Sequence, residues 1–319
     1  MHPLTYGDIK AATDRIAGHI RPVTLAPADR QPYELWFALE FMQHTGSFKA
    51  RGAWNFLRAH REAGTLPEAG VTIASGGNAG LACAWAARQQ GVRATVFVPE
   101  TAPAVKVARL RGYGAEVRQT GTEYADALAA CEEFAATSGA LASQAYDHPL
   151  VAAGAGTLLE EIHRQVPGLD TVVVSVGGGG LFAGVATAAR HHGIRTVAVE
   201  PENCRALNAA IGAGRPVDVP VDSIAADSLG ARRATALALH AAQEGGVHSV
   251  LVPDEEIARV RQELWDDRRL AVEGAAATAL AALTAPDRPG AADHGYRPAA
   301  GGKICVVLCG ANTDPSDLV

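Results

Sequence analysis

Short apolar segments of strand length alternate with longer segments of helical pattern from residue 71 onward. Because two parallel strands need a long crossover connection, usually a helix, this alternation predicts βαβ units and a parallel sheet. The fold class predicted from the residues is therefore α/β. We expect strands at VTIAS (71–75), ATVFVP (94–99), AEVRQT (115–120), ALASQ (140–144), TVVVSV (171–176), RTVAVE (195–200), HSVLV (248–252) and KICVVLCG (303–310).

The expected strands fall into two series, which predicts two α/β domains in a chain of 319 residues. We assign residues 68–145 to a smaller α/β domain, and residues 1–67 together with 146–319 to a larger one. The opening segment combines a helix with extended stretches. Residues 285–302, rich in Ala, Pro and Gly, are expected to form a surface loop.

Composition narrows the class of partner. Hydrophobic residues make up 48% of the chain and charged residues 19%, as in soluble globular proteins. The net charge of -6 supplies no basic field for nucleic acid or an anionic membrane, so we expect a small-molecule partner. Residues 1–20 lack the apolar core of a secretory signal, and no segment reaches the roughly 18 apolar residues of a membrane-spanning helix.

The cysteines and histidines give no sign of a metal or disulfide framework. The five cysteines are widely spaced, without the short paired spacings of zinc or thioredoxin-like sites. We expect reduced thiols in a cytoplasmic protein. The 11 histidines are also scattered, and we predict no metal site.

A run of glycines, Gly177–Gly180, follows an apolar strand and opens a helix. Converging backbone N–H groups and the helix dipole can bind a phosphate there without lysine. A P-loop is excluded because Gly-Leu-Phe follows in place of Gly-Lys-Ser/Thr. Two alternatives stay open: a tight turn without a ligand, and a dinucleotide fingerprint, since Gly178, Gly180 and Ala183 have G-x-G-x-x-A spacing and Glu200 ends the next strand.

A lysine lies in apolar surroundings in TGSFKARGA, residues 45–53, where Phe48 and Ala50 flank Lys49. An apolar environment disfavours the ammonium form, lowers the pKa and makes the amine available as nucleophile or base. The alternative is a surface lysine that extends its amine into water.

A second glycine loop, SGGNAG, occupies Ser75–Gly80 between an expected strand and an expected helix. Ser75 and Asn78, with the free N–H groups of the helix N-terminus, could bind an anion. Simple helix capping is the alternative. The sequence thus offers two anion sites and a candidate reactive lysine.

Five segments, in this order and at these separations, resemble the fold-type II pyridoxal-phosphate enzymes of the serine/threonine dehydratase and serine racemase branch. They are TGSFKARGA, SGGNAG, VGGGGL, AVEGAAATALAAL and VVLCGAN. The resemblance covers nearly the whole chain. It implies a fold like that of the tryptophan synthase β subunit: two open twisted α/β domains with the cofactor between them.

The resemblance also implies roles by position. Lys49 matches the lysine that forms a Schiff base with pyridoxal 5'-phosphate, and Asn78 matches a residue near the cofactor's 3'-oxygen. Cys309 matches the Ser or Cys that faces the pyridine nitrogen. The full implied cofactor site is Lys49, Phe48, Asn78, Gly177, Gly178, Gly179, Gly180, Leu181, Cys309 and Glu273, where Glu273 gives cofactor-adjacent support. The implied loop for the substrate carboxylate is Ser75, Gly76, Gly77, Asn78 and Ala79.

The implied activity is a dehydratase (ammonia-lyase) reaction. A β-hydroxy L-amino acid such as L-threonine or L-serine loses its Cα proton to Lys49 and then its hydroxyl, and the resulting aminoacrylate hydrolyses to a 2-oxo acid and ammonia. A thiol at Cys309 makes a weaker electron sink than a charged partner would, which favours prompt β-elimination. A homodimer is implied. The chain ends soon after the last expected strand, so we expect no appended regulatory domain and a role in amino-acid catabolism.

Alternatives to a dehydratase come from three classes. A β-replacement synthase would use the same cofactor. An NAD-binding Rossmann oxidoreductase would explain only the Gly177–Gly180 run. A non-catalytic cofactor-binding protein would not need Lys49.

Several positions depart from the family pattern. Gly76 replaces the serine that serves racemases as the acid/base on the opposite ring face, so we predict negligible racemase activity. Ala79 replaces a common histidine, which leaves room for a β-substituent larger than methyl. Tyr146 takes an often-Asn position near the 3'-oxygen, and Ser228 replaces a glycine near the cofactor. Glu200 matches a cation ligand of some members, but its companion Asp is Ala206, so no metal activation is expected.

Overall fold

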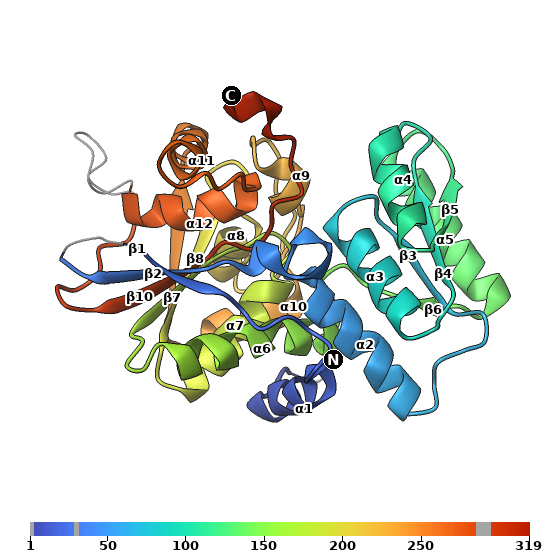
Figure 1. Cartoon of the computed structure of the whole chain (residues 1–319), viewed down its shortest axis with the longest axis horizontal. Helices are drawn as coiled ribbons and strands as arrows, with labels where there is room; N and C mark the ends of the chain where they lie inside the picture. Colours follow the sequence, from blue (N-terminus) through green and yellow to red (C-terminus); the bar gives the residue numbers. More distant parts are fainter. Residues whose placement is uncertain (1–2, 29–31, 285–294) are drawn as a thin grey trace.

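The structure, a computed structural model, describes residues 3–28, 32–284 and 295–319. The chain forms two units, each built around its own sheet (Figure 1). Most of the predicted surface loop, residues 285–294, lies outside the described residues, and residues 295–302 contain no helix or strand. The two-unit α/β architecture predicted from the alternating pattern is confirmed.

The larger sheet has six strands in the order β1-β2-β10-β7-β8-β9. All neighbouring strands are parallel except β1 and β2, which pair antiparallel at one edge. Its strands are β1 (Leu25–Ala28), β2 (Glu34–Ala38), β7 (Thr171–Ser175), β8 (Arg195–Pro201), β9 (Val247–Val252) and β10 (Lys303–Val307). Four of these match segments expected from the sequence. β1 and β2 fall in the opening segment, where only extended stretches were expected; β1 contains Pro27, which is tolerated because β1 is an edge strand.

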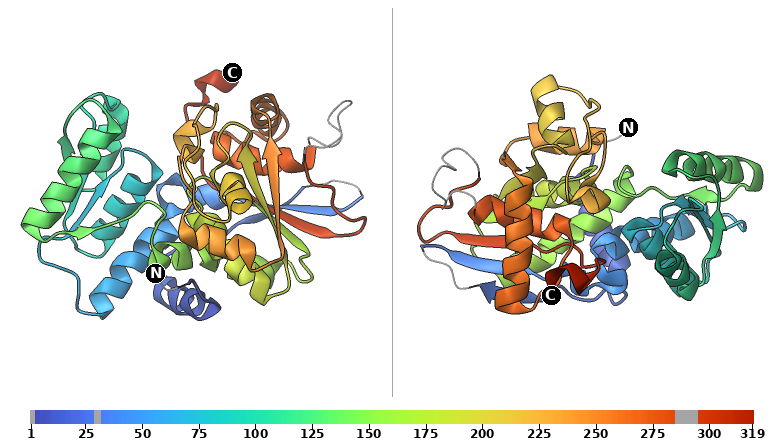
Figure 2. Two further views of the ribbon diagram at one scale, coloured as in Figure 1. Left: turned by 180° about the vertical axis from the view of Figure 1, so that it is seen from behind. Right: turned by 90° about the horizontal axis from the view of Figure 1, so that it is seen from above.

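Helices cover both faces of the larger sheet. α6 (Pro149–Gln165) and α7 (Gly180–His191) lie on one face, and α11 (Asp254–Arg268) and α12 (Gly274–Thr284) on the other (Figures 1 and 2). Because both faces are covered, every residue of β7 is buried, which explains why its sequence is continuously apolar rather than alternating. The other helices of this unit are α1 (Tyr6–Ile16), α8 (Ala206–Ala213), α9 (Ala226–Leu229) and α10 (Ala236–Gln243), with 3-10 turns η1 (Glu40–Met42), η2 (His44–Gly46) and η4 (Pro315–Leu318).

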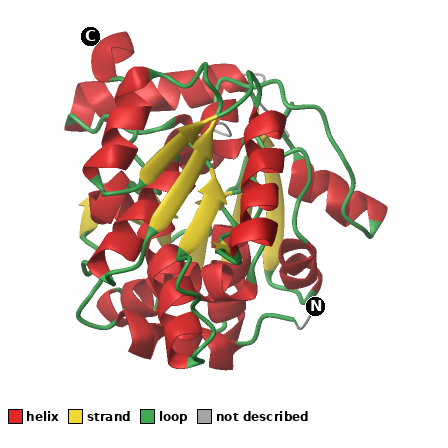
Figure 3. Cartoon of the chain, turned by 90° about the vertical axis from the view of Figure 1, so that its right-hand side faces the viewer, coloured by secondary structure: helices red, strands yellow, loops and turns green. Residues whose placement is uncertain are grey.

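The smaller sheet has four parallel strands in the order β5-β4-β3-β6. They are β3 (Val71–Ala74), β4 (Ala94–Val98), β5 (Glu116–Gln119) and β6 (Leu141–Ala142), and the helices beside them are α3 (Asn78–Gln89), α4 (Ala104–Gly112) and α5 (Tyr124–Ser138) (Figure 1). Figure 3 views the molecule from the side on which this unit lies. β6 is shorter than expected. α5 ends at Ser138, as predicted, because Gly139 takes the left-handed conformation with φ 72°.

α2 (Lys49–Glu62) connects the two units. It packs on α6 of the larger unit, and its apolar residues share a core with the smaller sheet. The domain boundary at residue 67 therefore stays a prediction. Among the described residues, no helix combines the length and the apolar composition needed to cross a membrane.

Candidate active site

Lys49 is the first residue of α2, the helix that connects the two units. Arg51, two residues later and fully buried, anchors the helix start by ion pairs with Glu40 at 2.5 Å and Glu161 at 2.7 Å. Lys49 itself is half-buried, and its Nζ donates a hydrogen bond to the Ala145 carbonyl at 2.8 Å. This placement rules out the alternative of a lysine extended into water.

The surroundings of the Lys49 amine favour its neutral form. Its Nζ lies 4.9 Å from the centroid of the Phe48 ring and 5.8 Å from that of Tyr146. Burial lowers the pKa of Lys49 to about 8, although the nearby acidic groups Cys309 and Glu273 raise it in part. Near neutral pH, an appreciable fraction of this amine is therefore unprotonated and nucleophilic.

Cys309 is brought to Lys49 by pairing between the segment before α2 and the loop after β10. Phe48 N–H donates to the Cys309 carbonyl at 3.0 Å, and Ser47 forms a bridge with Gly310. The Cys309 thiol lies 3.8 Å from the Ser175 hydroxyl. Burial raises the pKa of Cys309 to about 12, so the group is a neutral thiol at physiological pH.

The glycine run Gly177–Gly180 joins β7 to α7. Among the described residues, the backbone N–H groups of Gly177, Gly178 and Gly179 donate to no other protein group. Gly179 has φ +98°, and a Cβ there would lie 2.4 Å from Ala238 Cβ. Only glycine fits this turn, and its free donors stand at the N-terminus of a buried helix, as an anion site requires.

Tyr146 connects this loop with Lys49. A Cβ on Gly178 would lie 2.2 Å from the Tyr146 ring, so the ring rests directly on the glycine loop. The same ring faces the Lys49 amine. Burial raises the pKa of Tyr146, which keeps its hydroxyl protonated. Leu181 follows the loop and is buried in the core.

The second loop, Ser75–Ala79, joins β3 to α3 on the smaller unit. Within the loop, the Gly77 N–H donates a hydrogen bond to the Ser75 hydroxyl at 3.3 Å. In the described part of the chain, the N–H groups of Gly76, Asn78 and Ala79 donate to no protein acceptor. The loop is partly exposed, so these donors are accessible to an anion.

Glu273 joins the two units through Asn78. The buried Glu273 carboxylate accepts bonds from Asn78 Nδ2, at 2.9 Å to each oxygen, and from the Asn312 backbone N–H at 2.7 Å. Burial raises the pKa of Glu273, although these hydrogen bonds lower it in part. Sequence reasoning missed Asn312 and its partner Arg109; the only signal was the asparagine of the CGAN segment.

The residues present fit pyridoxal 5'-phosphate. The cofactor has an anionic phosphate, an aldehyde that reacts with an amine, and a pyridine nitrogen. The chain offers free N–H donors in Gly177–Gly179, a half-buried amine of lowered pKa in Lys49, and a neutral thiol in Cys309. The Tyr146 ring contacts the glycine loop and faces the Lys49 amine, so the glycine loop and the amine lie close to the same ring.

Ser228 and Glu200, two of the positions considered against the family pattern, have structural roles. The Ser228 hydroxyl accepts a hydrogen bond from Ala275 N–H at 3.2 Å, at the start of α12. The Glu200 carboxylate accepts from the N–H groups of Leu207 and Asn208, at 2.7 and 2.8 Å, at the start of α8. Within the described residues, no three His, Cys, Asp or Glu side chains cluster as metal ligands would.

Glu200 predicts a pH dependence of stability. Burial raises its pKa from the ordinary 4.5 to about 7, although the two backbone hydrogen bonds lower the pKa in part. The folded protein therefore keeps this proton at pH values where the unfolded chain has released it. We expect the free energy of unfolding to fall as pH rises from about 4.5 to about 7, by on the order of 3 kcal/mol.

Denaturant titrations at pH 5 and pH 8 on the wild type and Glu200→Gln would measure this effect. The fall in stability should be smaller in the variant, which mimics the protonated carboxyl. Glu255→Gln, at an exposed position on α11, is the control and should retain the wild-type fall. The same fall in the free energy of unfolding between pH 5 and pH 8 in all three proteins would contradict the prediction.

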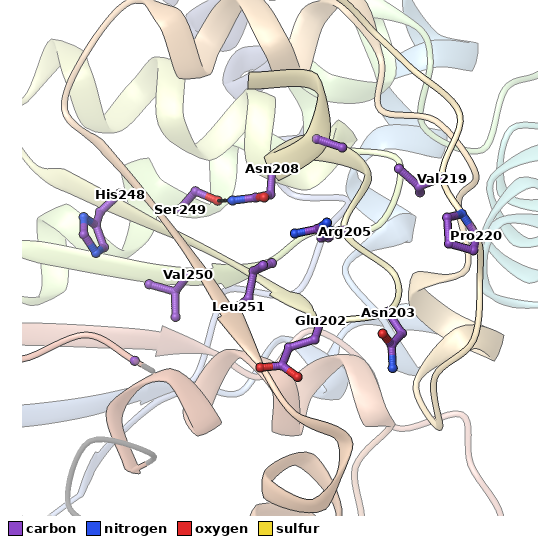
Figure 4. A pocket seen from close by; sticks show the side chains of 12 residues that line it. Glu202, Asn203, Arg205, Asn208, Val219, Pro220, His248, Ser249, Val250 and Leu251 are labelled. Atoms are coloured by element: carbon purple, nitrogen blue, oxygen red, sulfur yellow. Dashed lines mark hydrogen bonds between the residues drawn. The ribbon is translucent and has the colours of Figure 1, made fainter. Parts of the chain in front are cut away.

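A separate cavity of about 720 Å³ lies beside β9 (Figure 4). Its lining includes Arg205, Asn208, His248 and Ser249. None of the predicted site residues lines it. The candidate active site is therefore defined by the loops that converge between the two units.

Comparison with known proteins identifies the family. The family described as pyridoxal-phosphate dependent enzyme matches residues 16–310. The chain is 37% identical to the L-threonine ammonia-lyase of Geobacter sulfurreducens over 287 residues, which are 88% of this chain and 71% of that protein. It is 37% identical to the human serine dehydratase-like protein over 279 residues, 86% of this chain and 83% of that protein. The structure of maize serine racemase superimposes with a TM-score of 0.88 at 27% identity, covering 99% of this chain and 96% of that one.

The family match spans both units and includes Lys49, both glycine loops and Cys309. The fold-type II fold and the pyridoxal-phosphate cofactor expected from the resemblance are confirmed. The dinucleotide interpretation of Gly177–Gly180 is not supported, because it would leave the rest of the match unexplained. The chain belongs to the family of pyridoxal-phosphate dependent enzymes.

Proposed function

We propose that this chain is a pyridoxal-phosphate-dependent dehydratase (ammonia-lyase) that converts a β-hydroxy L-amino acid, such as L-threonine or L-serine, to a 2-oxo acid and ammonia. The observation that carries the proposal is the Lys49 amine: half-buried, with its pKa lowered to about 8, and placed near both the Tyr146 ring and Cys309. The names of the two relatives, L-threonine ammonia-lyase and serine dehydratase-like, support the same reaction.

The proposed binding roles follow from the free donors. The N–H groups of Gly177–Gly180 hold the cofactor phosphate, with Leu181 behind them. Phe48 and Tyr146 flank the Lys49 amine. The Ser75–Ala79 loop, including Gly77, holds the substrate carboxylate with backbone N–H groups. Glu273 and Asn78, hydrogen-bonded to each other, give polar support beside the ring.

The proposed chemical roles belong to Lys49 and Cys309. When bound, pyridoxal 5'-phosphate supplies an electron sink that stabilises negative charge at the substrate's Cα. The Lys49 amine, in its neutral form, accepts the Cα proton. The Cys309 thiol, with its pKa raised to about 12, gives the ring nitrogen no negative charge, which weakens the sink and favours loss of the β-hydroxyl over a long-lived carbanion.

A racemase is the second candidate, because maize serine racemase has a similar structure. Gly76 argues against it, because the loop carries no acid/base side chain at this position. Among the described residues, a Cβ at Gly76 would have one neighbour within 4 Å, Val98 Cγ1 at 3.4 Å, an ordinary van der Waals contact. A serine therefore fits there without displacing the loop.

We expect Gly76→Ser to fold as the wild type does and to gain racemisation of serine by about a hundredfold, the low end of what general acid–base catalysis contributes. Chiral chromatography of the remaining substrate measures it. Gly77→Ser is the matched control: it adds a hydroxyl to the same loop, and a Cβ there would meet no atom of the described residues within 4 Å. Equal racemisation by both variants would remove the role assigned to position 76.

The function is tested by the colour and products of the purified protein. We expect a yellow protein whose visible absorbance shifts on addition of amino acid. A panel of β-hydroxy amino acids, including bulkier ones than threonine because of Ala79, should release ammonia and 2-oxo acid in equal amounts. A product with a new β-substituent would indicate a synthase, NAD binding without the chromophore would indicate an oxidoreductase, and absorbance shifts without turnover would indicate a non-catalytic binder.

We further propose that the enzyme is a cytoplasmic homodimer in amino-acid catabolism. All five cysteines are free and buried, which suits a reducing compartment. The dimer rests on the family resemblance alone. Sedimentation equilibrium should give twice the mass of the chain, and a monomer at micromolar concentration would contradict this.

A further inference from the structure

Both polar atoms of the Asn312 side chain, in the loop after β10, form hydrogen bonds. Its Nδ2 donates to the Asn78 Oδ1 at 2.6 Å and to the Thr45 carbonyl at 2.7 Å. Its Oδ1 accepts from the Arg109 guanidinium at 2.5 Å. Its backbone N–H donates to Glu273 Oε1 at 2.7 Å.

The chemistry of the partners fixes the orientation of this amide. A guanidinium can only donate, so the Asn312 oxygen must face Arg109. A main-chain carbonyl can only accept, so the Asn312 nitrogen must face Thr45. An aspartate has nearly the same shape but lacks both donors, so it cannot replace this asparagine.

These partners come from four separate parts of the fold. Thr45 lies four residues before Lys49, and Glu273 directly precedes α12 in the larger unit. Asn78 begins α3 and Arg109 lies on α4, both in the smaller unit (Figure 1). Asn312 is thus a direct hydrogen-bonded link between the Lys49 segment and the loop expected to hold the substrate carboxylate.

The backbone on the Lys49 side is shaped to accept this link. Gly46 has φ +79°, and a Cβ there would lie 2.8 Å from Asn312 Oδ1. Thr45 takes φ 66°, a conformation that costs free energy for a β-branched residue. Ala311 N–H donates to the Gly46 carbonyl at 3.0 Å, which holds the two segments in register.

We propose that Asn312 is a positioning residue that fixes the Ser75–Ala79 loop relative to Lys49, and that Arg109 acts through it by setting its amide. The inference deepens the proposed function and rests on it for the identity of the bound anion. Among the described residues, Asn312 makes no hydrogen bond to the Lys49 amine or to the free N–H donors of the loop, so it acts through Asn78, Glu273 and Thr45.

Steady-state kinetics on the holoenzyme test the first part. Loss of hydrogen bonds to charged groups corresponds to about tenfold or more, so we expect Asn312→Ala to raise KM at least tenfold while kcat changes less than about threefold. Asn312→Asp should raise KM at least as much, because it loses the donors and places a second carboxylate beside Glu273. Asn208→Ala, at a partly buried asparagine on α8, is the control and should leave KM unchanged. A wild-type KM in Asn312→Asp would overturn the proposal.

A double-mutant cycle tests the second part. Arg109 is exposed and its guanidinium donates to Asn312. We expect Arg109→Ala to raise KM severalfold in the wild type and to have no effect in the Asn312→Ala background, and Arg109→Lys to restore part of the loss. Independent, additive effects would show that Arg109 does not act through Asn312.

Hydrogen exchange separates this inference from the proposed function. If the wild type turns over no amino acid, the proposed function fails, but the link can still be measured on the cofactor-loaded protein. Amides in the first turns of α3, beginning with Leu81, whose N–H donates to the Gly77 carbonyl, should then exchange faster in Asn312→Ala than in the wild type, with Asn208→Ala unchanged. Identical exchange in all three proteins would overturn the positioning role, whatever the activity.

Discussion

Lys49→Ala is expected to lower kcat for release of 2-oxo acid by about a thousandfold or more, because general base catalysis alone contributes on this order. The variant should also lose the visible chromophore that depends on an amine at this position. The reason lies in the surroundings of the amine: burial lowers its pKa to about 8, and its only hydrogen-bond partner in the described part of the chain is the Ala145 carbonyl.

A coupled assay for the 2-oxo acid, together with visible spectra, measures both effects. Lys106→Ala removes an exposed lysine on α4 and is the control. It should keep the wild-type spectrum and turnover. Full activity in Lys49→Ala would remove this residue from the mechanism, and loss of activity in both variants would indicate a general effect of altered charge.

Gly179→Ala is expected to weaken pyridoxal 5'-phosphate binding by about a hundredfold. A Cβ in the left-handed region costs roughly 1–2 kcal/mol, and overpacking adds roughly 1–3 kcal/mol. Both apply here, since φ is +98° and the Cβ would lie 2.4 Å from Ala238 Cβ. The loop must shift, and its N–H donors then no longer converge on the phosphate.

Fluorescence or absorbance titration of the cofactor-free protein with pyridoxal 5'-phosphate measures the affinity. Gly193→Ala is a matched control: Gly193 also has positive φ, +70°, and lies beyond the other end of α7, but a Cβ there would meet no atom of the described part of the chain within 4 Å. The control variant should be slightly less stable than the wild type, and its affinity for pyridoxal 5'-phosphate should be unchanged. Equal affinity in Gly179→Ala and Gly193→Ala would refute the phosphate role of the loop.

Much of the fold could be predicted because its signals are local. β7 and α7 follow from a β-branched run, glycines and an alanine-rich segment that are contiguous in sequence. β1 and β2 could not be placed, because β1 is short, contains Pro27 and lies at the edge of the sheet, paired with β2. The extent of β6 depends on pairing with β3, which the sequence of residues 140–144 does not encode.

The candidate site divides in the same way. The glycine loops are predictable because turn geometry and helix N-termini are properties of a few adjacent residues. Asn312 and Arg109 are not, because they are 203 positions apart and neither belongs to a local pattern with chemical meaning. Their roles exist only because α4 and the loop after β10 meet in space.

The sequence by itself determined the α/β alternation, the two glycine loops and the lysine that the chemistry requires. The tertiary structure decided how reactive those groups are. Lys49 has a pKa of about 8 because Phe48, Tyr146 and their neighbours exclude water from its amine, and Cys309 stays a thiol for the same reason. Desolvation depends on every element packed around a group, and hence on the whole fold rather than on the residues beside it.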